Sequence, residues 1–204
     1  MLTLGLCGGS GTGKTTAQAA FCDAGIAGLD TDLLYHELIS GDTPLSRTLI
    51  ATFGGTIRAA GGGIDRRALA ALVFGSPEAD ARRAELNRIT HREVLRECRA
   101  FLTAERKRGA FAAVINAPLL FESGFAEECD LTIAILAPRD VRISRIVARD
   151  GITPEEAARR IDAQLTDAFL TQRTTYQIHN DGSETELRQA VATLIEKIKN
   201  RMEE

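Results

Sequence analysis

The residues best suited to chemistry lie near the N-terminus, in the stretch GLCGGSGTGKTT that ends at Thr16. Gly8, Gly13, Lys14 and Thr15 match the pattern G-x-x-x-x-G-K-[ST]. Glycines let a loop turn its N–H groups toward phosphate oxygens, the lysine adds a positive charge, and the threonine hydroxyl is a magnesium ligand. The pattern therefore predicts binding of a nucleoside triphosphate such as ATP with Mg²⁺. The predicted binding residues are Gly8, Gly9, Ser10, Gly11, Thr12, Gly13, Lys14, Thr15 and Thr16.

The flanking sequence has the form that this loop requires. Residues 2–7 are apolar and predict a buried strand, and a helix is expected from about Lys14 to Asp23. A strand before the loop and a helix after it place the positive end of the helix at the phosphates.

The remaining sequence favours a transferase over a nucleotide-binding switch or motor. A GTPase would carry D-x-x-G and N-K-x-D, and neither string occurs. A small-molecule kinase instead requires a carboxylate near the acceptor hydroxyl, a lobe that shapes the acceptor pocket, and arginines that neutralise the phosphates.

Two carboxylates, Asp30 and Asp32, follow the second predicted strand at 24–30. In a parallel sheet this position adjoins the phosphate loop, where one carboxylate could accept the proton of the acceptor hydroxyl and the other could order magnesium-bound water. Spacing alone leaves a second role open for Asp32, as the N-cap of the following helix.

Four arginines are spaced by three, three and four residues, at Arg139, Arg142, Arg145 and Arg149. This spacing places them on one face of a helix. The face is either solvated and paired with neighbouring aspartates, or part of a lid that brings positive charge to the transferred phosphoryl group.

The overall composition is that of an ordinary globular protein. The chain has 204 residues, 44% of them hydrophobic, and a net charge of -3. This balance gives no basic field to attract nucleic acid, and the apolar runs are too short to cross a membrane. With no leader pattern at the N-terminus, we expect a cytoplasmic protein that does not bind nucleic acid or membranes.

Short apolar runs alternate with longer helical patterns, which predicts an α/β chain with a parallel sheet. Further strands are expected at 110–117 and 130–136. Ser76-Pro77, TPEE (153–156) and SETE (183–186) are helix-start signals, and the last opens an amphipathic C-terminal helix.

Taken together, these features resemble the dephospho-CoA kinase family. After the phosphate loop, the matching stretches are LDTDLLYHELI, FGG, GGGIDRRALAALVF, LNRITHREV, NAPLLFESG, RISRIVARDGITPEEAARRIDAQ and IHNDG. Their order and spacing make the resemblance specific, and it extends from Leu2 to about Val191.

The resemblance implies a three-layer P-loop NTPase fold with a parallel five-stranded sheet, a helical acceptor lobe and a lid, in one domain over 1–204. The core would comprise 1–31, 110–138 and 176–204, the acceptor lobe 32–109 and the lid 139–175. The implied reaction transfers the γ-phosphate of ATP to the ribose 3′-hydroxyl of dephospho-CoA, the last step of coenzyme A synthesis. A P-loop kinase for another small acceptor, such as a nucleotide or a sugar-like alcohol, is the alternative.

By position, the resemblance assigns roles to individual residues. Asp32 would be the general base, and Arg145 and Arg149 would be lid arginines that act in catalysis with Lys14. Asn180 and Gly182 would lie near the nucleotide base. The implied acceptor-binding residues, besides Asp32, are Phe74, Leu86, His91, Pro118, Leu119 and Glu122.

Some roles remain open at this stage. His91 is either an acceptor contact or a polar residue on a helix surface, and Glu122 either binds an acceptor hydroxyl or caps local backbone. Tyr35 and Phe121 are candidates to stack on adenine, with core packing as the other role for Phe121.

The sequence also departs from the family pattern. Asn116 occupies a position where relatives often carry Asp, so it brings no negative charge to magnesium, and Arg142 stands where a glutamine is common. We expect a monomer or a weak homo-oligomer.

Overall fold

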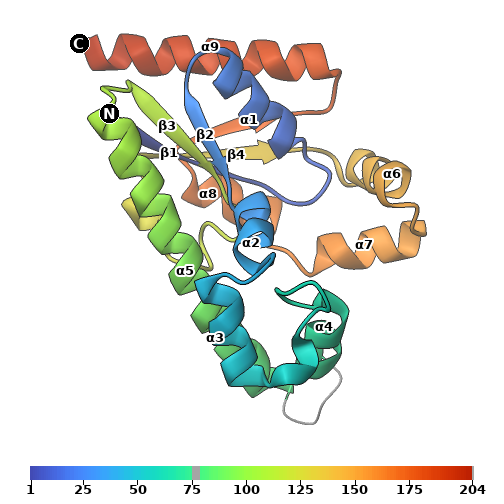
Figure 1. Cartoon of the computed structure of the whole chain (residues 1–204). Coiled ribbons are helices and arrows are strands. Elements are labelled where there is room, and N and C mark those ends of the chain that lie inside the picture. The colour runs from blue at the N-terminus through green and yellow to red at the C-terminus, as the bar shows by residue number, and fades with distance from the viewer. Residues whose placement is uncertain (75–78, 204) are drawn as a thin grey trace. The chain divides into compact units, whose positions relative to one another are not determined.

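The computed structural model describes residues 1–74 and 79–203 and contains one five-stranded sheet in the order β2-β3-β1-β4-β5 (Figure 1). The strands are β1 (Leu2–Cys7), β2 (Ala27–Asp30), β3 (Ala112–Asn116), β4 (Leu131–Leu136) and β5 (Tyr176–His179). β1 pairs in parallel with both β3 and β4, and β4 pairs in parallel with β5. The predicted parallel α/β fold is confirmed.

The chain forms two compact units. The first comprises Met1–Leu29 and Leu102–Glu204, and the second comprises Asp30–Phe101. The first unit contains the phosphate-loop sequence and nearly all of the sheet, while the second begins at the first of the two predicted carboxylates.

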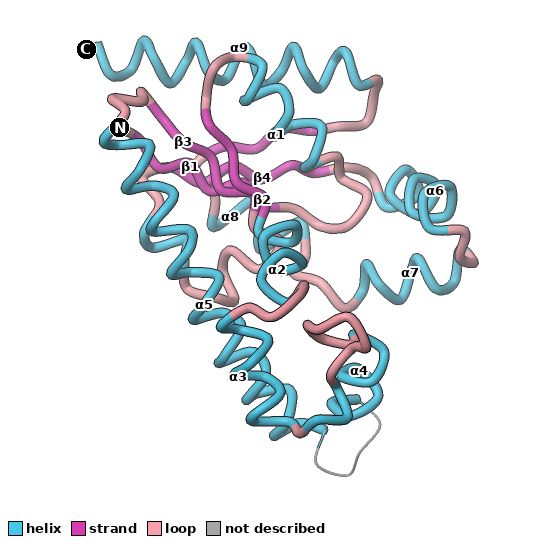
Figure 2. The backbone as a smooth tube through the Cα atoms, viewed as in Figure 1, coloured by secondary structure: helices cyan, strands magenta, loops and turns pink. Residues whose placement is uncertain are grey.

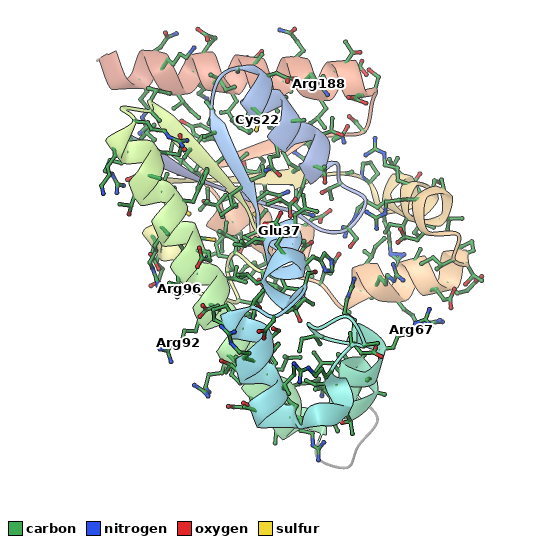
Figure 3. The ribbon with its side chains drawn as sticks, viewed as in Figure 1. Cys22, Glu37, Arg67, Arg92, Arg96 and Arg188 are labelled. Atoms are coloured by element: carbon green, nitrogen blue, oxygen red, sulfur yellow. The ribbon has the colours of Figure 1, made fainter. Side chains whose placement is uncertain are left out.

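In the first unit, helices α1 (Lys14–Asp23) and α9 (Glu184–Glu203) contact each other on one side of the sheet (Figure 1). Arg188 of α9 donates to Asp23 of α1 at 2.6 Å (Figure 3). The predicted apolar stripe of the C-terminal helix is buried in the core that these helices form with the sheet, through Leu187, Val191, Leu194, Ile195 and Ile198. Burial of this stripe fixes α9 against the strands.

Three shorter helices follow β4 in the first unit: α6 (Arg139–Asp150), α7 (Pro154–Asp162) and α8 (Asp167–Arg173). α6 and α7 pack on each other through their own small core, which includes Ile146, Ala157 and Ile161. The predicted capping box at the start of α7 is present, because the Thr153 and Glu156 side chains each accept a backbone N–H of the other residue. These helices form the segment predicted as the lid.

The second unit consists of helices and loops (Figure 2). Its helices are α2 (Thr31–Ile39), α3 (Pro44–Phe53), the short 3₁₀ turn η1 (Gly55–Ile57), α4 (Arg66–Phe74) and the greater part of α5 (Ala79–Lys107). They enclose a separate hydrophobic core, with Leu49, Ile57 and Val73 at its most buried positions. The predicted helix start at Ser76-Pro77 lies outside the described residues.

A second 3₁₀ turn, η2 (Phe125–Glu128), follows β3 in the first unit. Within residues 1–74 and 79–203, no helix combines the length and apolar character that crossing a bilayer requires.

Candidate active site

The phosphate loop runs between β1 and α1 and depends on glycine at specific positions. Gly8, Gly11 and Gly13 have φ values of 146°, 78° and 97°, in the left-handed range that side chains disfavour. A Cβ atom at Gly8 would also overlap the carbonyl oxygen of Ile135. The strand, loop and helix therefore have the context that the sequence pattern predicted.

The loop folds back on the carbonyl oxygen of Gly9. That oxygen accepts hydrogen bonds from the Thr12 hydroxyl at 2.9 Å and from Lys14 Nζ at 3.0 Å. The lysine ammonium is thus held against the loop, where it can meet the oxygens of a bound phosphate chain. Thr15, in the first turn of α1, has an exposed side chain.

Arg145 of α6 joins the loop to the segment after β5. Its guanidinium donates to the carbonyl oxygens of Gly11 at 3.4 Å, Asn180 at 3.1 Å and Gly182 at 3.2 Å. The buried amide of Asn180 in turn donates to the Thr12 carbonyl oxygen at 2.7 Å. Three of the predicted nucleotide-binding and lid positions, Arg145, Asn180 and Gly182, therefore meet at the phosphate loop.

Arg142 and Gln164 hold the loop at Ser10. The Arg142 side chain is only 4% exposed, and its Nε donates to the Ser10 carbonyl oxygen at 3.0 Å. Gln164 Oε1 accepts from the Ser10 N–H at 2.8 Å and from Arg142 Nη2 at 3.2 Å. Burial lowers the pKa of Arg142, an effect that the nearby Asp167 carboxylate opposes.

A Cβ atom at position 9 would overlap the Arg142 guanidinium, so any other residue there would require that arginine to shift from the loop. Sequence reasoning did not single out Gln164. It lies just after α7 at the end of the quoted RRIDAQ stretch, and an isolated glutamine carries no spacing signal that could reveal its partner on a distant loop.

The other two arginines of the predicted face contact aspartates. Arg139 binds Asp162 at 2.7 Å, and Arg149 binds the adjacent Asp150 at 2.6 Å with 62% of its side chain exposed. The hydrogen bond to Asp150 raises the pKa of Arg149. The face is thus divided, with two arginines on the loop and two in exposed ion pairs.

A small pocket of about 80 Å³ opens beside the loop. Its lining includes Gly8 and Gly9 of the loop, and Gln164. It also includes three of the predicted acceptor-binding residues, Pro118, Leu119 and Glu122. The structure therefore brings the loop and this predicted group together within the first unit.

Cys7 also lines this pocket, and burial raises the pKa of its thiol to about 12, with Lys14 acting to lower it and Glu122 to raise it. The thiol is therefore protonated at neutral pH and is a poor nucleophile.

Phe121 packs against other side chains of the first unit. Its ring meets that of Phe169 edge to face at 5.5 Å, and the Arg173 guanidinium lies 5.9 Å from its centroid. These contacts favour the packing role among the two that the sequence left open.

Asn116, at the end of β3, is buried and donates to Gln18 Oε1 of α1 at 3.0 Å. No group of three or more His, Cys, Asp or Glu side chains arranged for a metal ion occurs among the described residues. Mg²⁺ is commonly held by one or two protein oxygens plus substrate phosphates and water, and an exposed Thr15 hydroxyl at the loop fits that donor set.

In the second unit, the structure separates the two roles considered for the carboxylates. Asp30 is the N-cap of α2, because its Oδ1 accepts the N–H groups of Asp32 at 2.9 Å and Leu33 at 3.1 Å. Asp32 lies in the first turn of α2 with an exposed side chain. The cap role therefore belongs to Asp30 and not to Asp32.

The other candidates in the second unit have different surroundings. Phe74 is 67% exposed, with the Arg83 guanidinium 5.6 Å from its ring centroid. Leu86 and Tyr35 are half-buried against the helical core. His91 is half-buried on α5. Burial raises the pKa of Tyr35, and the charge of Arg66 acts to lower it.

Comparison with known proteins identifies the family. The family model described as dephospho-CoA kinase matches residues 2–186. A dephospho-CoA kinase from Brucella melitensis biotype 1 is 36% identical over 196 residues, which cover 96% of this chain and 94% of the relative.

Solved structures have the same fold. A Thermus thermophilus protein matches with a TM-score of 0.77 and 32% identity, over 96% of this chain and 97% of its own. A dephospho-CoA kinase from Campylobacter jejuni matches with a TM-score of 0.70 and 24% identity, over 96% of both chains. With its phosphate loop, its parallel sheet and this match along nearly the whole sequence, the chain belongs to the dephospho-CoA kinase family of P-loop kinases.

Proposed function

We propose that the protein transfers the γ-phosphoryl group of ATP to the ribose 3′-hydroxyl of dephospho-CoA, giving coenzyme A and ADP. The observation that carries the proposal is the pocket shared by Gly8 and Gly9 with Pro118, Leu119 and Glu122. It lies beside the phosphate loop and has room for about one phosphoryl group or a few waters. Family membership supports dephospho-CoA as the acceptor.

The first unit would bind and neutralise the triphosphate. Lys14 is held at the loop and offers a point charge to the β- and γ-oxygens, and Arg145 adds charge from α6. Because phosphoryl transfer proceeds through a loose transition state, positioning and charge neutralisation account for most of the rate enhancement.

Mg²⁺ would be held at the Thr15 hydroxyl together with phosphate oxygens and water, and when bound it would neutralise charge on the β- and γ-phosphates. Asn116 contributes an uncharged amide near α1 through its bond to Gln18. Position 116 therefore brings no negative charge to the ion.

In the second unit, Asp32 would accept the proton of the 3′-hydroxyl as the bond to phosphorus forms. Its exposed carboxylate at the start of α2 supports this role, because Asp30 already supplies the cap. General-base catalysis of this kind contributes about 10²–10⁴-fold to the rate.

We further propose a cytoplasmic enzyme that is monomeric or weakly self-associating. The proposal is supported by the separate hydrophobic cores that the two units bury within a single chain. Sedimentation velocity across a range of protein concentrations tests this point.

The experiment that tests the function is an ADP-release assay over a panel of acceptors, namely dephospho-CoA, adenosine, AMP, shikimate and no acceptor. We expect turnover that depends on dephospho-CoA and Mg²⁺. ADP release at the same rate without any acceptor would contradict a transferase. Faster ADP release with another alcohol than with dephospho-CoA would identify that alcohol as the substrate instead.

A further inference from the structure

A second, larger cavity lies entirely within the second unit, separate from the pocket at the phosphate loop. Its volume is about 380 Å³, compared with about 80 Å³ for the pocket at the phosphate loop. It is lined by His36, Ile39, Ser40, Gly41, Gly62, Ile64 and Arg66. The lining combines a guanidinium, an imidazole, a hydroxyl and two apolar side chains.

The wall of this cavity is a fixed backbone structure. Ser40 and Gly63 form an antiparallel bridge, and the Ile64 N–H donates to the Ile39 carbonyl oxygen at 3.0 Å. Gly63 has a φ of 75°, and a Cβ atom there would lie 2.7 Å from the Ile39 carbonyl oxygen. Only glycine lets the two turns approach this closely, so the shape of the wall is built into the sequence.

The charge inside this cavity is positive. Arg66 is the first residue of α4 and is exposed, and no carboxylate of the described residues forms an ion pair with it. The closest acidic neighbour in sequence, Asp65, accepts the N–H groups of Arg67 at 2.9 Å and Ala68 at 3.1 Å. Asp42, on the adjoining turn, binds Arg47 at 3.2 Å.

The imidazole adds further hydrogen-bonding capacity. His36 lies on α2 with its ring centroid 6.0 Å from that of Tyr35. The positive charge of Arg66 acts to lower the pKa of the Tyr35 hydroxyl. Glu37 is next in sequence, but consecutive helix residues face different directions, so its carboxylate does not share the His36 face. The guanidinium and the imidazole therefore offer N–H donors to the same space.

We propose that this cavity binds the diphosphate group of the acceptor, an inference that rests on the proposed function. A guanidinium binds phosphate oxygens through paired N–H donors, and an imidazole N–H can add a third. Ile39 and Ile64 would contact the less polar part of the acceptor next to the diphosphate.

The position of the cavity relative to Asp32 supports this assignment. Asp32 and His36 are four residues apart on α2, so they lie on one face, separated by about one helical turn of 5.4 Å. A ribose whose 3′-hydroxyl meets Asp32 has its 5′-phosphate at roughly that separation. The cavity would then select acceptors that carry a 5′-diphosphate over plain nucleosides.

The kinetic test compares Arg66→Ala with Arg67→Ala in the full-length protein. Both remove one exposed arginine of α4, and Arg67, labelled in Figure 3, does not line the cavity. For Arg66→Ala we expect the KM for dephospho-CoA to rise about 10- to 100-fold, with kcat and the Kd for ATP nearly unchanged. The KM of Arg66→Lys for dephospho-CoA should lie between those of the wild type and Arg66→Ala. The KM of Arg67→Ala should equal that of the wild type. Equal KM values for Arg66→Ala and Arg67→Ala would overturn the proposal.

A binding test separates this site from the proposed function. Inorganic pyrophosphate is titrated into the labelled wild-type protein, and ¹H–¹⁵N NMR resolves the amides of Gly41 and Gly62 from those of Gly8 to Lys14. We expect the cavity amides to shift in the wild type and not in Arg66→Ala. Shifts confined to the phosphate loop would overturn the site, whatever the acceptor assay shows. Cavity shifts in a protein that fails to phosphorylate dephospho-CoA would retain the anion site and overturn the proposed function.

Discussion

The phosphate loop of the first unit and the acceptor-binding candidates of the second unit are supported in different ways. Side chains hold the backbone of the loop: Thr12, Arg142 and Asn180 donate to its carbonyl oxygens. Gln164 Oε1 accepts the Ser10 N–H. In the second unit, Asp32 and Arg66 are exposed side chains at the beginnings of helices. In the proposed function, triphosphate binding therefore depends largely on backbone groups of the loop, whereas the roles of Asp32 and Arg66 depend on their exposed side chains.

This difference makes separate predictions for the two regions. Substitutions at the loop should affect ATP, and substitutions on α2 or α4 should affect the acceptor or the chemical step. The variants below test that division, beginning with the largest expected effect.

Lys14→Met should reduce phosphoryl transfer by about 10³-fold or more, because it removes the charge held against the loop at the Gly9 carbonyl oxygen. Steady-state ADP release measures the effect. Lys107→Met, at the exposed end of α5, is the matched control and should keep wild-type turnover. Turnover of Lys14→Met above a few per cent of wild type would remove Lys14 from the transition state.

Asp32→Asn should lower kcat at least about 100-fold while leaving the Kd for ATP close to that of the wild type. The amide keeps the size of the side chain but cannot accept the hydroxyl proton at neutral pH. Single-turnover kinetics and ATP titration measure the two quantities separately. Glu37→Gln, on the same helix, controls for loss of a carboxylate, and a kcat for Asp32→Asn within tenfold of wild type would exclude Asp32 as the base.

Gln164→Ala should weaken ATP binding by about tenfold, since it removes the acceptor of the Ser10 N–H and a partner of Arg142. The KM for dephospho-CoA should change little. Calorimetric titration with ATP is the measurement, and Gln172→Ala, an exposed glutamine of α8, is the control. If both variants bind ATP equally well, Gln164 has no role in holding the loop for the nucleotide.

Asn116→Asp should lower the Mg²⁺ concentration for half-maximal activity by a few-fold. It places a negative charge beside Gln18, near the Thr15 end of α1, where magnesium would bind. A magnesium titration of turnover tests this, with the exposed substitution Asn87→Asp of α5 for comparison. If the Mg²⁺ concentration for half-maximal activity is unchanged, a charge at position 116 does not affect magnesium binding.

The sequence predicted much of the fold because the relevant signals are local. β1 and α1 begin and end at the expected residues, and the capping box at Thr153 and Glu156 is present. The second strand is shorter than the expected 24–30, at Ala27–Asp30, because Gly25 adopts a φ of 81° that turns the chain just before it. The short strand β5 has half-exposed residues and lacks the continuous apolar run that marked β1, β3 and β4.

The site was predictable to the extent that it follows a motif. The phosphate loop and its glycines follow the G-x-x-x-x-G-K-[ST] motif. Pro118, Leu119 and Glu122, which line the pocket beside the loop, were predicted through the family resemblance. The division of the arginines between loop and aspartates was not predictable, because helical spacing fixes a face but not its partners. Gln164 and the cavity at Arg66 depend on contacts between segments distant in sequence, which spacing does not encode.

The most direct test of the central claim is the identity of the product. ³¹P NMR can identify it during a reaction with ATP, Mg²⁺ and dephospho-CoA. The account predicts that a phosphomonoester signal of the 3′-phosphate of coenzyme A appears in step with ADP. Inorganic phosphate appearing with ADP, or a phosphomonoester at any position other than the ribose 3′-oxygen, would contradict it.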